Sequence, residues 1–300
     1  MTAQMSTAES AAATRPTPAG WRQAIRDFAR NKKGAAGLAA IVFMLAFSFV
    51  GPLFYHTDQI HPNLLQITVP PSGKFPLGTD NVGYNVLGRL MVGGQSTMEV
   101  GLAAAVIAGV IGTLWGAIAG FAGGWLDSVM MRIVDAFLAI PSLLLVLLLA
   151  AIVTPSVFMI ILVLGCISWL ITARLVRSEV LVLRSLDYVH ASRVFGATPR
   201  QTVLRHVIRN VIGTVVVQVT FEVANAILLF AALSFLGLGP PPPAANWGGM
   251  LTDGLNYVFA GYWWLIYPAG ICIVVVVVAF NLVGDALRDI FEVRLRSRDL

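Results

Sequence analysis

Long apolar runs separated by short polar segments dominate this chain. Three runs hold no charged residue at all, namely 34–54, 100–121 and 136–173, and two further apolar runs cover about 212–235 and 263–283. A hydrocarbon layer about 30 Å thick is crossed by about 20 residues of helix. Backbone hydrogen bonds in that layer must close within the helix itself. Each run therefore predicts at least one membrane-spanning helix.

The run 136–173 is too long for one crossing. Thr154-Pro155-Ser156 divides it, because proline ends a helix and favours a turn. The division predicts a third span over about Ile133–Val153 and a fourth over about Val157–Ala173. With the first span at Gly34–Phe54, the total is six transmembrane helices in an all-α polytopic membrane protein.

The composition agrees with this class. Hydrophobic residues make up 57% of the chain and charged residues 12%, against roughly 25% charged residues in an ordinary soluble domain. The mean hydropathy is +0.81. This composition is not expected for a soluble enzyme or for a disordered chain. Cys166 and Cys272 lie in apolar runs and indicate neither a disulfide framework nor a metal cluster.

The basic residues predict the orientation. They cluster before the first span, between the fourth and fifth spans and in the tail, so that only Lys74 and Arg89 of the 20 Lys and Arg residues fall on the other side. By the positive-inside rule, both termini are expected in the cytoplasm. The net charge of +5 then requires no nucleic-acid partner.

These patterns divide the chain into five parts. Residues 1–33 are expected to be a cytoplasmic tail with a helix at the membrane surface, where a straight extension of the first span is an equal alternative. The remaining parts are the first transmembrane helix at 34–54, an external loop at 55–98, a five-helix core at 99–285 that includes a cytoplasmic connection at 174–211, and a cytoplasmic tail at 286–300.

Small residues recur every four positions in the second span: Ala104, Ala108, Gly112, Gly116, Gly120 and Gly124. Such spacing lets two helix backbones approach closely in a membrane. The pattern predicts tight helix packing, with a partner helix from this chain or from another.

The fifth span carries Gln218, Glu222 and Asn225 on one helical face. A carboxylate inside a membrane is costly and is expected to face protein or water. This face is a candidate lining of a translocation pathway; the alternatives are an interhelical hydrogen-bonded contact or a protonated Glu222. Asp135 is expected to be structural and to pair with Arg132 at i−3.

The connection between the fourth and fifth spans has its own internal organisation. Asp187 can cap a short helix that runs to about Phe195, and Gly196 can end it. Thr198-Pro199-Arg200-Gln201 then reads as a capping box that starts a second helix. We expect a rigid elbow that transmits force from a soluble partner.

The run 187–197 resembles the EAA loop of type I ABC importer permeases, specifically the C-type subunit of dipeptide and oligopeptide permeases. Three more segments match the same family in order along the chain: 75–83, 233–250 with its Pro241, Pro242, Trp247, Gly248 and Met250, and 279–289. The resemblance covers almost the whole chain after residue 20.

The resemblance implies a function and its partners. The short helix would dock on an ATPase subunit, and the residues expected to couple to it are Asp187, His190, Ala191, Ser192, Arg193, Gly196 and Ala197. The implied partners are a homologous B-type permease, two ABC ATPases or one fused pair, an extracytoplasmic peptide-binding protein, the peptide substrate and membrane lipid. ATP and Mg²⁺ would be bound by the ATPases, and the complex would lie in the bacterial inner membrane. No cofactor, metal or catalytic residue is expected in this chain.

The chain departs from the family pattern at four places. His190 stands for the family's Glu and Ser192 for its second Ala, so an ion pair from that Glu is not carried over. Gly83-Tyr84-Asn85 replaces a frequent Gly-Arg-Asp, and Leu229 stands where many relatives have an acidic residue.

The sequence is compatible with other functions. Nickel and glutathione permeases share the general pattern. A self-contained secondary transporter could use Glu222 as an ion site, and a membrane scaffold would not transport at all. The chain is not expected to be an ATPase, because its only Gly-Lys pair, Gly73-Lys74, lacks a phosphate-binding loop around it.

Overall fold

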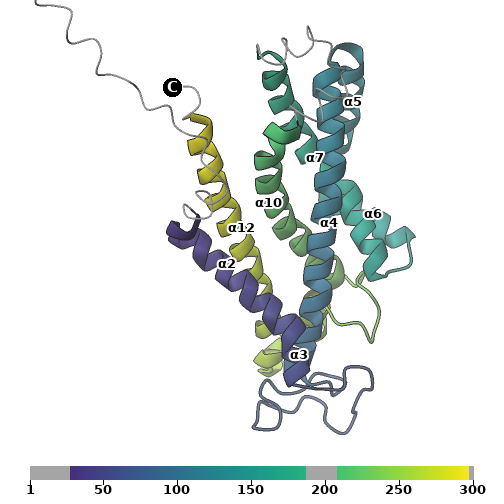
Figure 1. Ribbon diagram of the computed structural model, residues 1–300. Helices are drawn as coiled ribbons and strands as arrows, with labels where there is room; N and C mark the ends of the chain where they lie inside the picture. The colour runs from purple at the N-terminus through teal and green to yellow at the C-terminus, as the bar shows by residue number, and fades with distance from the viewer. Residues whose placement is uncertain (1–27, 187–207, 297–300) are drawn as a thin grey trace, which may run out of the picture.

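A computed structural model describes residues 28–186 and 208–296, and this part of the chain is a bundle of helices (Figure 1). Its only extended pairing is an isolated bridge between Thr79 and Asn85 within the described residues. The helices are α2 (Lys32–Leu45), α3 (Gly51–Phe54), α4 (Val86–Ala122), α5 (Gly124–Leu138), α6 (Ser142–Ile152), α7 (Val157–Arg184), α10 (Ile208–Phe235), α11 (Trp247–Leu255) and α12 (Tyr267–Arg296).

The first span consists of α2, a π-helical segment η1 (Ala46–Val50) and α3, which together form one candidate membrane crossing over Lys32–Phe54. Asn31 has an extended backbone, and its side chain accepts hydrogen bonds from the amides of Lys33 and Gly34 at 3.1 and 3.2 Å. Asn31 therefore interrupts the helix and begins α2 as a new one. The helical residues 28–30 that precede it are not a straight extension of the first span.

The second span begins earlier than its apolar run. α4 starts at Val86, with Asn85 as its N-cap, so the loop predicted over 55–98 ends at Asn85. The charge of Glu99 marks the edge of the apolar run, yet Glu99 lies within the helix, as does Arg89, a residue that is only 6% exposed. A charge limits the part of a helix that can face lipid, and it does not by itself end the helix.

The small-residue stripe of α4 packs against α7 of the same chain. A methyl group added at Gly112 would lie 2.6 Å from the carbonyl oxygen of Trp169, and one at Gly120 would lie 2.9 Å from that of Arg177. Gly116 faces Ala173 between these two contacts. The partner helix that the sequence left open is therefore α7. Another face of α4 approaches α10 at Gly101 and Gly109, opposite Ile227 and Val219.

Gly124 does not belong to this stripe. α4 ends at Ala122, and Gly123 and Gly124 both have positive φ angles, 65° and 58°, in the turn that leads into α5. Positive φ is readily accessible to glycine, which explains why the chain reverses here.

The third predicted span, Ile133–Val153, is wrong as a single helix. The chain forms α5 and α6, which are bent by 84° relative to each other at a short break. Pro141 lies in this break with an extended backbone, and proline lacks the amide that would continue the helix. The described residues hold five helices that could cross a membrane, or six if the bent pair counts as one span.

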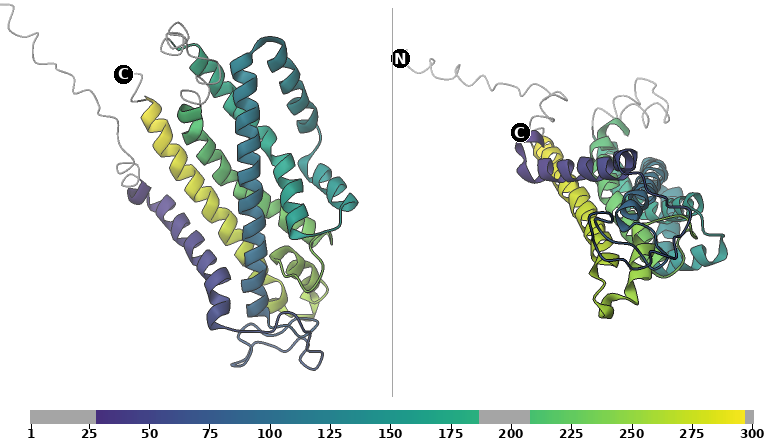
Figure 2. Two further views of the ribbon diagram at one scale, coloured as in Figure 1. Left: turned by 45° about the vertical axis from the view of Figure 1, so that its right-hand side comes forward. Right: turned by 90° about the horizontal axis from the view of Figure 1, so that it is seen from below.

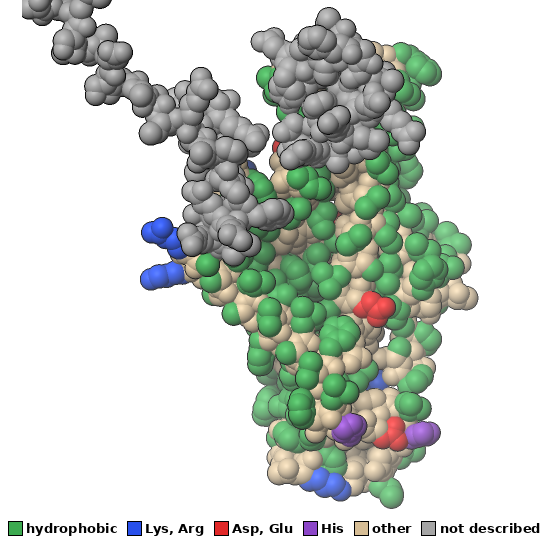
Figure 3. Space-filling view, in the orientation of Figure 1, with side chains coloured by type: hydrophobic (Ala, Val, Ile, Leu, Met, Phe, Trp, Pro, Cys, Tyr) green, Lys and Arg blue, Asp and Glu red, His purple; other side chains and the backbone are tan. Residues whose placement is uncertain are grey.

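The bundle has two distinct ends (Figure 2). At one end, which we call the loop end, residues 55–85 and 236–266 lie together, joined by hydrogen bonds such as that from the indole of Trp264 to the carbonyl of Thr79 at 3.3 Å. α7 ends, α10 begins and α12 ends toward the opposite end. Hydrophobic side chains cover much of the visible sides of the bundle (Figure 3).

Candidate functional site

A cavity of about 410 Å³ lies beside the break between α5 and α6. α7 and α10 form its other walls. Most of its lining is apolar, and its polar groups come from Ser142, Ser168, Glu222 and Asn225. A mostly apolar pocket with a few polar groups is the usual form of a small-molecule site.

Glu222 is the charged group of this cavity. Its side chain is buried, with 3% of the residue exposed, and the Ser168 hydroxyl on α7 lies within hydrogen-bonding reach of its carboxyl group. Asn225, almost one turn further along α10, also lines the cavity and is exposed at the surface of the chain. Gln218, one turn earlier, is half-buried and does not belong to the lining. Two of the three residues predicted for this face therefore meet at one cavity.

Sequence reasoning missed the wall made by Ser142, Leu145 and Ser168. The signal was available in Pro141, which breaks the third span and directs the start of α6 to this cavity. Leu229, the residue that replaces an acidic one of many relatives, also lines the cavity and adds to its apolar surface.

Two ion pairs join α5 to α7 in the half of α7 that follows the cavity. Arg177 forms a double hydrogen bond with Asp127 at 2.5 and 2.6 Å, and Arg174 contacts Asp135 at 2.5 Å. The expected pairing of Asp135 with Arg132 is therefore wrong: the partner comes from a neighbouring helix, 39 positions away in sequence. Two-point contacts of Arg with a carboxylate fix orientation as well as distance.

α7 leads directly from these ion pairs to the predicted coupling segment. It ends at Arg184, and α10 begins at Ile208. The coupling residues proposed from sequence lie outside the described residues: Asp187, His190, Ala191, Ser192, Arg193, Gly196 and Ala197. α7 and α10, the two helices that flank this segment, both line the cavity, and α7 also contributes one residue to each ion pair.

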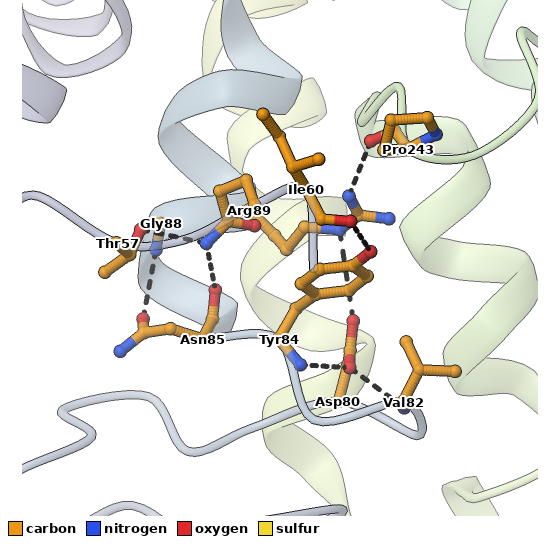
Figure 4. A network of polar contacts seen from close by, with 10 residues as sticks. Thr57, Ile60, Asp80, Val82, Tyr84, Asn85, Gly88, Arg89 and Pro243 are labelled. Atoms are coloured by element: carbon orange, nitrogen blue, oxygen red, sulfur yellow. Dashed lines mark hydrogen bonds and ion pairs between the residues drawn. The ribbon is translucent and has the colours of Figure 1, made fainter. Parts of the chain in front are cut away.

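At the loop end, Arg89 is the centre of a buried polar network (Figure 4). Its guanidinium donates to the carbonyl of Pro243 at 2.9 Å, lies 3.9 Å from the carboxylate of Asp80 and stands over the ring of Tyr84 at 4.4 Å. Asp80 in turn accepts hydrogen bonds from the amides of Val82 and Tyr84 at 3.0 and 2.8 Å. Burial raises the pKa of Asp80, although these amides and Arg89 act in the opposite direction.

This network closes the loop end. The Tyr84 hydroxyl donates to the carbonyl of Ile60 at 2.9 Å, and the indole of Trp247 donates to the carbonyl of Leu90 at 2.9 Å. The hydroxyl of Ser96 donates to the carbonyl of Ala245. Residues 55–85 and 236–266 thus form one connected cap on the start of α4.

Comparison with known proteins gives two family matches. The model of the family described as "Binding-protein-dependent transport system inner membrane component" matches residues 112–297. A second model, described as the "N-terminal TM domain of oligopeptide transport permease C", matches residues 20–71.

Individual relatives match over most of their length. The chain is 40% identical over 278 residues to the oligopeptide transport system permease protein OppC of Bacillus subtilis (strain 168), covering 92% of this chain and 90% of the relative. It is 35% identical over 288 residues to the dipeptide transport system permease protein DppC of the same organism, covering 96% and 90%. It is 38% identical over 255 residues to the probable D,D-dipeptide transport system permease protein DdpC of Escherichia coli (strain K12), covering 84% of each.

The family resemblance seen in the four sequence segments is confirmed by both the matched models and these relatives. The chain also has helices that are long and apolar enough to cross a membrane. It belongs to the family of binding-protein-dependent transport system inner membrane components and is a membrane permease subunit of an ABC importer.

Proposed function

We propose that this chain imports dipeptides or oligopeptides as one half of a translocation pathway, with ATP hydrolysis on partner subunits as the energy source. The relatives that match most of the chain are named as oligopeptide, dipeptide and D,D-dipeptide permeases. The observation that carries the proposal is the cavity between the α5–α6 break, α7 and α10, which has a buried carboxylate in its lining. Broken helices that line a polar site inside a membrane are typical of transport proteins.

The loop end faces the outside in this proposal, and the opposite end faces the cytoplasm. Arg174, Arg177 and Arg184 on α7 approach the cytoplasmic end, as the positive-inside rule requires. The connected cap of residues 55–85 and 236–266 is then the surface on which an extracytoplasmic peptide-binding protein docks.

The remaining partners are a homologous permease chain and two ABC ATPases or one fused pair. ATP and Mg²⁺ bind to the ATPases, because this chain carries no phosphate-binding loop. Residues 187–197 dock on one ATPase. Closure of the ATPases then biases the bundle between two states, and a partner that binds one state better shifts the equilibrium toward it.

α7 is the element that carries movement from the docked segment to the cavity. Its Arg177–Asp127 and Arg174–Asp135 pairs tie it to α5, and Ser168 on the same helix lines the cavity. A displacement of the end of α7 therefore moves α5 and one wall of the cavity together. This coupling requires no bond chemistry in the chain itself.

The test is uptake of a labelled dipeptide by proteoliposomes that contain this chain, its partner permease, the ATPases and the binding protein. We expect uptake with ATP and none with a non-hydrolysable ATP analogue. Unlabelled glutathione and a nickel salt serve as competitors: if they are accumulated and peptides are not, the peptide assignment is wrong while the permease role stands.

Buried Glu222 favours one alternative, a secondary transporter that works without partners. Proteoliposomes with this chain alone, under a proton or sodium gradient, separate the two functions. Gradient-driven uptake that disappears in Glu222→Gln and needs no ATPase would replace the present proposal.

A further inference from the structure

The cavity beside the α5–α6 break has a carboxylate on the wall formed by α10 and a helix N-terminus, which is partly positive, on the wall formed by α6. On the α10 wall, Glu222 supplies the carboxylate of a buried residue, of which only 3% is exposed. Among the described residues no ion pair includes Glu222. The lining residues include no Lys, Arg or His.

A buried carboxylate without a cationic partner is costly unless something compensates it. Ser168 offers one hydroxyl group, which is a neutral donor. Arg174, one to two turns beyond the lining residues of α7, is already engaged with Asp135 at 2.5 Å. A positively charged group that enters the cavity would therefore find the strongest available partner in Glu222.

The second wall is the start of α6. This helix has 11 residues, and no side chain caps its N-terminus. Its first residue, Ser142, and Leu145 both line the cavity. The amides of Leu144 and Leu145 donate to the carbonyl of Pro141 at 3.0 and 3.2 Å, which leaves the amides of Ser142 and Leu143 for a ligand. The N-terminus of a helix also carries a partial positive charge, which favours a negatively charged ligand group.

We infer that this cavity binds a small zwitterion, with its ammonium group at Glu222 and its carboxylate at the start of α6. The volume of about 410 Å³ lies in the range of small-molecule pockets and admits a ligand of the size of a short peptide. The inference rests on the proposed peptide transport and adds to it: this chain discriminates between substrates by their two charged ends.

The experiment measures equilibrium binding of labelled alanyl-alanine to the full chain in nanodiscs, without a binding protein or nucleotide. N-acetyl-alanyl-alanine and alanyl-alanine amide compete for the site. The wild-type chain is expected to bind both derivatives about tenfold or more weakly than the free dipeptide, because each lacks one charged end.

Glu222→Gln keeps the shape of the side chain and removes its charge. In this variant we expect the free dipeptide to bind about tenfold more weakly and the penalty for N-acetylation to disappear. The penalty for C-terminal amidation should remain, because it arises at α6. The matched control is Glu99→Gln, which removes an exposed carboxylate on α4 outside the cavity lining and should bind like the wild type.

Two results would overturn the inference: binding by Glu222→Gln that still discriminates against the acetylated dipeptide, or equal loss of both penalties. Absence of dipeptide binding to the wild-type chain would overturn it as well. None of these results touches the proposed function, which is tested separately by ATP-driven peptide uptake in the assembled transporter.

Discussion

Arg89 and Asp80 form an ion pair 3.9 Å long in which the side chains are only 8% and 14% exposed. The same guanidinium binds the carbonyl of Pro243, so two segments that are 154 positions apart in sequence meet at one cation. Gly83-Tyr84-Asn85, where relatives often have Gly-Arg-Asp, lies inside this arrangement, and Tyr84 offers its ring to Arg89 at 4.4 Å.

Arg89→Met should destabilise the chain by about 3 kcal/mol, because it leaves the buried Asp80 without a cationic partner. Thermal or denaturant unfolding of the purified protein in detergent measures the effect. Lys74→Met, at an exposed position of the same loop, is the control and should change little. Adding Asp80→Asn to Arg89→Met should recover part of the loss, and a double variant weaker than Arg89→Met would contradict the pairing.

Asp80 should make the stability of the loop end depend on pH. Burial raises the pKa of Asp80 above its ordinary value, so the protonated form is more favoured in the folded state than in the unfolded chain. Its stabilising contribution is complete below the unfolded pKa and is lost as the pH rises through the raised, folded value. The unfolding free energy of the wild type minus that of Asp80→Asn should therefore fall as the pH rises from about 4. A difference that grows over this range would show that the pKa is lowered instead.

Gly112→Ala should weaken the packing of α4 on α7. The new methyl group would lie 2.6 Å from the Trp169 carbonyl oxygen, and a clash with backbone is relieved only by moving a helix. We expect a loss of about 1–3 kcal/mol in unfolding free energy.

Gly270→Ala is the matched control for this substitution. Gly270 also lies in a helix, α12, but a methyl group added there would meet only Leu251 Cδ2, at an ordinary contact distance of 3.8 Å. Alanine there should be neutral or stabilising. Equal effects at the two positions would show that the close approach of α4 and α7 contributes little.

Arg177→Ala should lower the unfolding free energy by about 2 kcal/mol, because a two-point hydrogen bond to Asp127 is lost. Exchanging the charges, with Arg177→Asp and Asp127→Arg together, should restore part of the stability. Arg132→Ala, at an exposed position on α5, is the control. If Arg132→Ala lowers the unfolding free energy as much as Arg177→Ala does, the effect comes from removing any positive charge from these helices and not from breaking the Arg177–Asp127 pair.

Gly196→Pro and Arg193→Glu should abolish ATP-driven uptake while the chain still inserts into the membrane. Both residues lie outside the described part of the chain, and the expectation follows from the capped elbow predicted in sequence. Arg15→Glu, in the predicted N-terminal tail, is the control. Uptake at the normal rate in both coupling variants, measured in vesicles with equal amounts of protein, would refute the role of this segment.

The apolar runs alone determined the class of the protein and the approximate position of most of its spans, and four short segments of sequence carried the family resemblance. The small-residue spacing of α4 also predicted a close helix contact, because a period of four follows from helix geometry within one segment. These features depend on residues near one another in sequence, and local patterns record them directly.

Tertiary structure decided which groups meet. The packing of the helices places Gly112 against α7 and pairs Asp135 with Arg174. It also buries Arg89 beside Asp80. It also placed Pro141, a residue within a predicted span, at a break between two helices beside the cavity that Glu222 lines. The physical reason is that contacts between helices depend on how whole helices pack, and the spacing of residues along one helix identifies a face without identifying its neighbour.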